Sequence, residues 1–160
     1  MIIDSHQHFW NYDPIRDIWI DNSMAVLKRN FLPKDLKKIY KINSVDGCVA
    51  VQADQSEEET IFLLDQASKN NFIKGVVGWL DIKSSKLNDL LSYYTKYPVF
   101  KGLRHIVQNE KDINFMLKSD FQRGLSCLEE YNLTYDILIK EHQMDQAIKM
   151  VKKNPNQIFI

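Results

Sequence analysis

The chain has 160 residues, of which 44% are hydrophobic and 26% are charged, and its 21 basic and 21 acidic residues give a formal net charge of zero. This composition predicts one folded domain over 1–160 and excludes a disordered chain. The balanced charge argues against a nucleic-acid or membrane partner, so we expect a small-molecule ligand. No basic segment followed by an apolar run opens the chain, and no run reaches the ~18 apolar residues of a membrane span, so we expect a cytoplasmic protein.

Short β-branched runs alternate with helical patterns along the whole chain. Strands are predicted at 2–8, 45–52, 74–81, 99–104 and 133–139, with the opening of a sixth at 157–160. Between them, a loop that enters a short helix is predicted at 31–43, and further helices are predicted at 56–71, 85–97, 120–132 and 142–154. In the second of these helices, Ser56 and Glu59 have the spacing of a capping box, and Ile61, Leu64 and Ala67 are expected to form a core stripe.

The strict alternation of strand and helix predicts the α/β class, with a parallel sheet and helices outside it. No glycine-rich phosphate loop follows the first strand, which disfavours a dinucleotide-binding open sheet and favours a TIM (β/α)8-barrel type. A closed barrel needs about 200 to 250 residues. We therefore expect about five and a half βα units of a barrel that is incomplete at the C-terminus of this chain.

Two histidines stand two residues apart in the first predicted strand. In an extended strand Asp4, His6 and His8 point to the same face. A strand presents two imidazoles to one metal ion in this way, and a merely polar strand end is an equally good interpretation of these residues alone. In the second strand, alternation puts Cys48 and Ala50 on the face of Gln52, and we expect that face to line the barrel axis.

Functional residues of parallel α/β barrels collect at the carboxyl ends of the strands. The polar or aromatic side chains at these ends are Gln52, Trp79, Asp81, Arg104, His105, Gln108 and Asp136. Taken singly, Gln52, Asp81 and Asp136 are typical of turns, and Trp79 is typical of a core. Arg104 is the candidate for oxyanion or carboxylate recognition because its planar fork binds such groups, with a rim salt bridge as the alternative.

Several stretches occur in the order in which a known family has them: "IDSHQHFW", "FLPKDL", "VQADQSEEET", "GVVGWLD", "GLRHIVQNE" and "YDILIKEHQ". Through them nearly the whole chain resembles the N-terminal part of amidohydrolase family 2, in the sugar-acid and pyrone-dicarboxylate lactonase branch of the amidohydrolase superfamily. The resemblance implies a TIM barrel. It also implies a hydrolase that opens a small lactone, such as a sugar-acid 1,4-lactone, by water attack on the carbonyl.

The resemblance also implies roles for individual residues. His6 and His8 would contact the substrate carbonyl or hold one divalent metal, zinc or manganese, although some relatives need none. With a metal they would be neutral ligands; without one they would donate hydrogen bonds to the oxyanion. Arg104 would be catalytic as well. The residues that fall in pocket-lining segments of the family are Gln52, Trp79, Asp81, His105 and Gln108.

In the family a third histidine and an aspartate that serves as general base come in later strands, which would lie beyond Ile160. Three functions therefore stay open. The first is a lactonase whose later strands lie outside these residues. The second is a metal-dependent decarboxylase or amidohydrolase of the same superfamily. The third is a truncated, catalytically inactive protein that self-associates through the open edges of its barrel.

Overall fold

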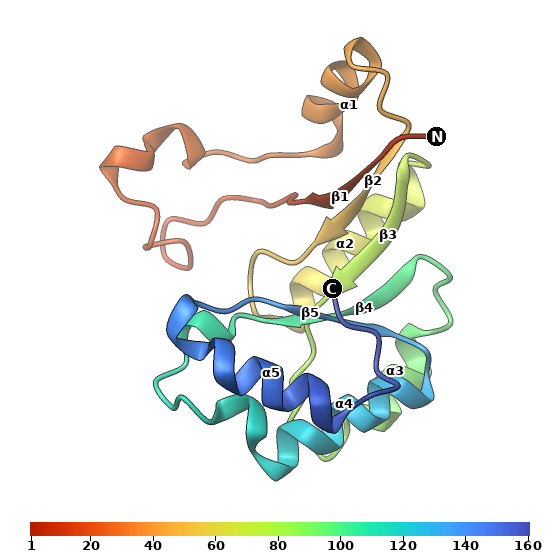
Figure 1. Cartoon of the computed structure of the whole chain (residues 1–160). Coiled ribbons are helices and arrows are strands. Elements are labelled where there is room, and N and C mark those ends of the chain that lie inside the picture. Colours follow the sequence, from red (N-terminus) through yellow and green to blue (C-terminus); the bar gives the residue numbers. More distant parts are fainter.

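The computed structural model describes residues 1–160 and contains one parallel sheet with helices packed along it (Figure 1). Its strands are β1 (Ile3–Gln7), β2 (Gly47–Val51), β3 (Ile73–Gly78), β4 (Phe100–His105) and β5 (Thr134–Ile137). They lie side by side in chain order, and every neighbouring pair is parallel. The sheet curls as one part of a TIM barrel, which confirms the predicted fold class.

A helix follows each strand, as the alternation of the sequence predicts. The helices are α1 (Pro33–Ile42), α2 (Glu57–Lys69), α3 (Leu87–Tyr94), α4 (Ser119–Glu130) and α5 (Met144–Lys153). Short 3-10 turns add η1 (Asn22–Leu27), η2 (Val107–Asn109), η3 (Phe115–Leu117) and η4 (Glu141–Gln143). Each helix is too short and too polar to cross a lipid bilayer.

The main core lies between the sheet and the helices. Cys48 and Ala50 of β2 are fully buried in this core together with Leu63 of α2. The expectation that these two small residues line the barrel axis is therefore wrong, because α2 packs against their face and the alternate face of β2 takes the inner position. Gln52 follows the last residue of β2, so strand alternation no longer governs the direction of its side chain.

Helix α2 buries Leu64 and Ala67 of the predicted stripe, but Ile61 is 54% exposed. Thr60 and Leu63 are buried on the same helix in addition. Thr60 belongs to the buried face because its hydroxyl donates to the carbonyl of Trp79 (2.7 Å) and accepts from the N–H of the same residue (2.8 Å). The helix thereby fixes the chain at the point where β3 ends, which a pattern of apolar residues alone does not reveal.

The start of α2 forms only half of the predicted capping box. The Ser56 hydroxyl accepts from the N–H of Glu59 (3.2 Å). The Glu59 carboxylate, however, accepts from the N–H groups of Ala53 (2.7 Å) and Asp54 in place of the N–H of Ser56. Burial raises the pKa of Glu59 to about 7, although both hydrogen bonds act in the opposite direction. Glu59 thus fixes the loop that leaves the carboxyl end of β2.

The last residues pair with β5, as predicted for the opening of a sixth strand. Tyr135 forms a parallel bridge with Phe159, and its N–H donates to the carbonyl of Ile158 (2.9 Å). The N–H of Ile160 donates to the carbonyl of Tyr135 (3.1 Å), and the N–H of Ile137 donates to the carbonyl of Ile160 (2.9 Å). The outer edge of β1 has no neighbouring strand.

An apolar groove of about 460 Å3 lies between the end of β5 and α5. The residues that line it are Ile137, Ile139, Met144, Ala147, Ile148, Val151 and Lys152. This groove and the outer edge of β1 are the surfaces on which the expected self-association would depend.

Gly124 marks the closest approach between α4 and the sheet layer. A β-carbon at this position would overlap the carbonyl oxygen and the side chain of Ile82, in the segment that follows β3. The carbonyl belongs to the backbone, so it has no rotamer by which to move away. Only glycine lets the helix pack at this distance.

We expect Gly124→Ala to lower the free energy of unfolding by about 1–3 kcal/mol, because overpacking outweighs the ~1 kcal/mol by which alanine favours a helix. Urea unfolding followed by circular dichroism measures the change. Ser126→Ala is the matched control, since Ser126 is exposed on the same helix and its replacement leaves the packing intact. A Gly124→Ala variant as stable as the parent would contradict the close contact.

Candidate active site

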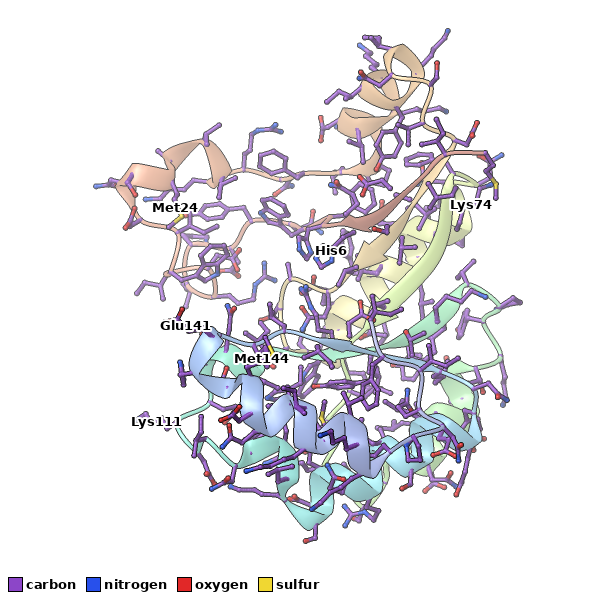
Figure 2. All side chains as sticks on the ribbon, viewed as in Figure 1. His6, Met24, Lys74, Lys111, Glu141 and Met144 are labelled. Carbon is purple, nitrogen blue, oxygen red and sulfur yellow. The ribbon has the colours of Figure 1, made fainter.

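His6 and His8 meet at the carboxyl end of β1, where Figure 2 labels His6. Their Nε2 atoms are 3.1 Å apart, and the two rings lie edge to face with centroids 4.8 Å apart. Asp4 lies on the same strand, but its carboxylate makes other contacts. It accepts from the Tyr40 hydroxyl (2.7 Å) and from the N–H of His6 (3.1 Å). The structure therefore brings the histidine pair together without Asp4 as a third member.

Hydrogen bonds fix the protonation pattern of the pair. His8 Nδ1 lies 2.8 Å from the carbonyl of Val51, which only accepts, so Nδ1 carries the proton and the Nε2 of the neutral ring has a lone pair. His6 Nε2 lies 3.0 Å from Arg104 Nη1, which only donates, so it is also an acceptor. Burial, together with the Arg104 charge, lowers the pKa of His6 and lowers that of His8 to about 4. Both Nε2 atoms are therefore acceptors when the two rings are neutral.

Arg104, on β4, holds three strands together through one guanidinium. Its Nη2 donates to both the backbone carbonyl and the side-chain oxygen of Gln52 (2.9 Å to Oε1), and the Gln52 amide donates back to the Arg104 carbonyl (3.3 Å). Its Nη1 donates to His6 (3.0 Å). Burial lowers the pKa of Arg104, and its Nε has no partner. The fork predicted to bind substrate is therefore largely engaged within the protein.

Asp136 completes this cluster. It lies on β5 directly opposite Arg104 in the strand register, and it is 8% exposed. Burial raises the pKa of Asp136, and the Arg104 charge acts in the opposite direction. The interpretation of Asp136 as a turn residue did not predict that it faces Arg104. The signal that could have found it is the register, because parallel neighbouring strands bring residues at equivalent positions to the same face.

Three further side chains form a separate hydrogen-bonded chain at the ends of β3 and β4. Trp79 Nε1 donates to His105 Nδ1 (3.3 Å), and His105 Nε2 lies 2.8 Å from Glu110 Oε1. The His105 ring stacks on Phe115 with centroids 4.9 Å apart. His105 follows Arg104 directly within β4, so the two side chains point to opposite faces and His105 stays outside the histidine cluster. Glu110 was not among the predicted site residues.

The remaining predicted residues, Asp81 and Gln108, make their hydrogen bonds away from the histidine pair. Asp81 is exposed, and its carboxylate accepts from the N–H of Lys83 (3.0 Å), which forms a turn after β3. Gln108 lies in η2 and is half-buried, with its backbone N–H bonded to the carbonyl of Leu138 (3.1 Å). Neither side chain forms a hydrogen bond with the histidine cluster.

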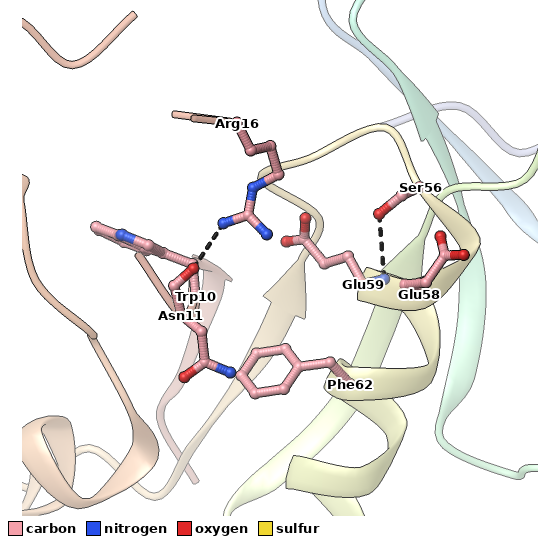
Figure 3. Close-up of a pocket in the computed structure, with 7 residues that line it drawn as sticks. All are labelled: Trp10, Asn11, Arg16, Ser56, Glu58, Glu59 and Phe62. Carbon is pink, nitrogen blue, oxygen red and sulfur yellow. Dashed lines mark hydrogen bonds between the residues drawn. The ribbon is translucent and has the colours of Figure 1, made fainter. Parts of the chain in front are cut away.

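A cavity of about 220 Å3 lies between the segment that follows β1 and the first turns of α2 (Figure 3). Trp10, Arg16, Glu59 and Phe62 are among its lining residues. None of the predicted site residues lines it. Arg16 is already paired with Asp17 (2.8 Å), so the cavity presents no free cation of its own.

The histidine pair fits a divalent metal as part of a ligand set. Two neutral Nε2 atoms 3.1 Å apart are electron-pair donors of the kind that zinc and manganese accept, and a cation bound to both would relieve the contact between two acceptors. No three histidine, cysteine, aspartate or glutamate side chains of the chain are arranged so that they could hold a metal ion together. A catalytic zinc site has three protein ligands, so His6 and His8 would be two of them.

Sequence comparison relates the chain to lactonases. It is 36% identical to an L-fucono-1,5-lactonase of Burkholderia multivorans over 143 residues, which are 89% of this chain and 48% of that protein. It is 28% identical to an L-fucono-1,5-lactonase of Burkholderia ambifaria over 153 residues, 96% of this chain and 53% of that protein. The chain thus spans about half the length of the curated relatives it matches. No known protein-family profile matches it.

The chain is also similar to solved structures. An amidohydrolase from Burkholderia multivorans with bound zinc superimposes with a TM-score of 0.95 and 32% identity, covering 99% of this chain and 56% of that one. A dihydroxybenzoic acid decarboxylase from Polaromonas with bound manganese has a TM-score of 0.76 and 10% identity, covering 99% and 64%, and it shows the shared fold alone. The chain is therefore similar to lactonases and other proteins of the amidohydrolase superfamily over about half of their length.

Proposed function

We propose that the protein opens a sugar-acid lactone by water attack on the carbonyl carbon, with His6, His8 and Arg104 as residues of the catalytic site. The observation that carries this proposal is the convergence of the three side chains at the carboxyl ends of β1 and β4. The similarity to two L-fucono-1,5-lactonases supports a 1,5-lactone or 1,4-lactone of a sugar acid as the substrate class. The partner is a small molecule, and the proposed location is the cytoplasm.

The protonation pattern favours a metal over direct hydrogen bonding by the histidines. With His8 Nδ1 donating to the Val51 carbonyl, its neutral Nε2 has no proton to give to an oxyanion. His6 Nε2 is likewise an acceptor. We propose that both hold a divalent ion, zinc or manganese, which when bound would polarise the lactone carbonyl and lower the pKa of its water.

Arg104 supplies a hydrogen-bond donor at the same place. Its Nη1 donates to His6 Nε2, so Nη1–H is left without an acceptor when that nitrogen binds a ligand. The freed N–H would then be available to donate to the carbonyl oxygen as it gains negative charge, and Gln52 holds the rest of the guanidinium in place. Arg104 therefore combines a structural role with stabilisation of the oxyanion.

The proton of the attacking water needs a general base. No residue of this chain is assigned to that role. Because the chain spans about half of its relatives, the assay uses the protein at the length at which its cells make it, established by intact mass.

A panel of sugar-acid 1,4- and 1,5-lactones tests the proposal through the acid released on hydrolysis, with and without a chelator followed by zinc or manganese. Turnover of a lactone supports the proposed function. Decarboxylation or amide hydrolysis that depends on zinc or manganese, with no lactone turnover, would replace it with the chemistry of a sister branch. No turnover, with association that rises with concentration, would indicate an inactive protein.

His8→Ala is expected to lower kcat at least about 10²-fold while the protein stays folded, because the site loses one of its two imidazoles. Steady-state lactone hydrolysis measures the loss, and thermal melting checks the fold. His142→Ala is the control, since His142 is exposed next to α5 and should leave turnover unchanged. Unchanged turnover in His8→Ala would remove the pair from the site.

Arg104→Lys is expected to raise KM or to lower kcat, by about 10²-fold in kcat/KM, because a single ammonium replaces a planar fork that contacts Gln52 and His6 together. The matched control is Arg123→Lys, on the exposed face of α4. Normal kinetics in Arg104→Lys would return this residue to a purely structural role.

A further inference from the structure

The hydrogen-bonded chain of Trp79, His105 and Glu110 has a direction that its chemistry imposes. An indole N–H only donates, so His105 Nδ1 must accept from it. A neutral imidazole that accepts at one nitrogen carries its proton on the other, so Nε2–H donates to the Glu110 carboxylate, which only accepts. The carboxylate therefore selects the one tautomer of His105 that can receive the Trp79 proton.

The surroundings fix the imidazole plane as well as its protons. Phe115 is 3% exposed and stacks on the His105 ring at an interplanar angle of 23°. The Lys83 and Lys118 ammonium groups lie 4.9 and 5.8 Å from the centre of the Phe115 ring. The His105 side chain is 9% exposed and the Glu110 side chain 32% exposed, so the contact between them is largely shielded from water.

Trp79, whose indole donates to His105, is the first residue after the end of β3. Its backbone is fixed independently by the two hydrogen bonds to the Thr60 hydroxyl. Its side chain is half-buried, at the same carboxyl edge of the sheet as the histidine pair. Because His105 accepts the only polar hydrogen of the indole, a ligand that contacts the Trp79 side chain would meet its apolar ring and find no donor there.

We propose that Glu110 is a positioning residue that acts through His105 to orient Trp79, so that the indole offers a ring face, and not its N–H, to the substrate. The assignment of that substrate as a lactone rests on the function proposed above. Packing of a ring face suits the C–H side of a sugar-acid ring. Glu110 and His105 thus influence which ligand binds without touching it.

Nuclear magnetic resonance of the indole groups tests this orientation without any substrate. The chain has three tryptophans, and Trp79→Phe identifies the signal of Trp79 among the three N–H signals in protein labelled with 15N-tryptophan. We expect Glu110→Ala to move the Trp79 signal upfield and to leave those of Trp10 and Trp19 in place. Glu110→Gln should keep the parent position, because its amide oxygen still accepts from Nε2–H.

Two results would overturn the proposal. One is a Trp79 signal that is the same in Glu110→Ala as in the parent. The other is a His105 ring that carries its proton on Nδ1, as read from the long-range 1H–15N couplings of 15N-labelled histidine, since such a ring cannot accept from Trp79. Lactone turnover is a separate readout: its absence would remove the lactone from the proposal, whereas the indole and imidazole signals decide the orientation of Trp79 independently.

Discussion

One buried guanidinium organises the inner face of this sheet. A charge taken out of water is costly unless hydrogen bonds and opposite charge replace its hydration. Arg104 meets most of that requirement through Gln52 after β2, His6 on β1 and the facing Asp136 on β5, and its Nε alone has no partner. Each of these partners must stay where it is for the charge to remain satisfied, so the same interaction that stabilises the cation also fixes the positions of the groups around it.

Two adjacent residues of β4 serve two separate networks. Arg104 points to the inner face and contacts the histidine pair, whereas His105 points to the helix side and links Trp79 to Glu110. The alternation of a strand keeps these networks apart even though their members are neighbours in sequence. One network carries the charge of the site, and the other sets the orientation of an aromatic side chain at its edge.

The order of strands and helices could be predicted because it depends on local patterns, and the histidine pair because alternation alone places both rings on one side. Side-chain directions that depend on tertiary packing could not be predicted from the sequence. The inner face of β2 was assigned wrongly because α2 decides which side of Cys48 and Ala50 it covers. Glu59 does not accept from the N–H of Ser56 as predicted, because its carboxylate accepts from the N–H groups of Ala53 and Asp54 after β2. Glu110 gave no local signal, since its role depends on a contact with His105.

The spatial order of the five strands is the same as their order in the chain. Every strand pairs with the one made just before it, and one helical connection separates the two, so the contacts of the sheet span short stretches of sequence. On the ribosome, β2 can dock on β1 before β3 has been translated, and each later unit adds to an edge that is already formed. The cluster around Arg104 begins to form when β4 arrives and is complete only when β5 adds Asp136, so it joins β4 and β5 to the strands made before them.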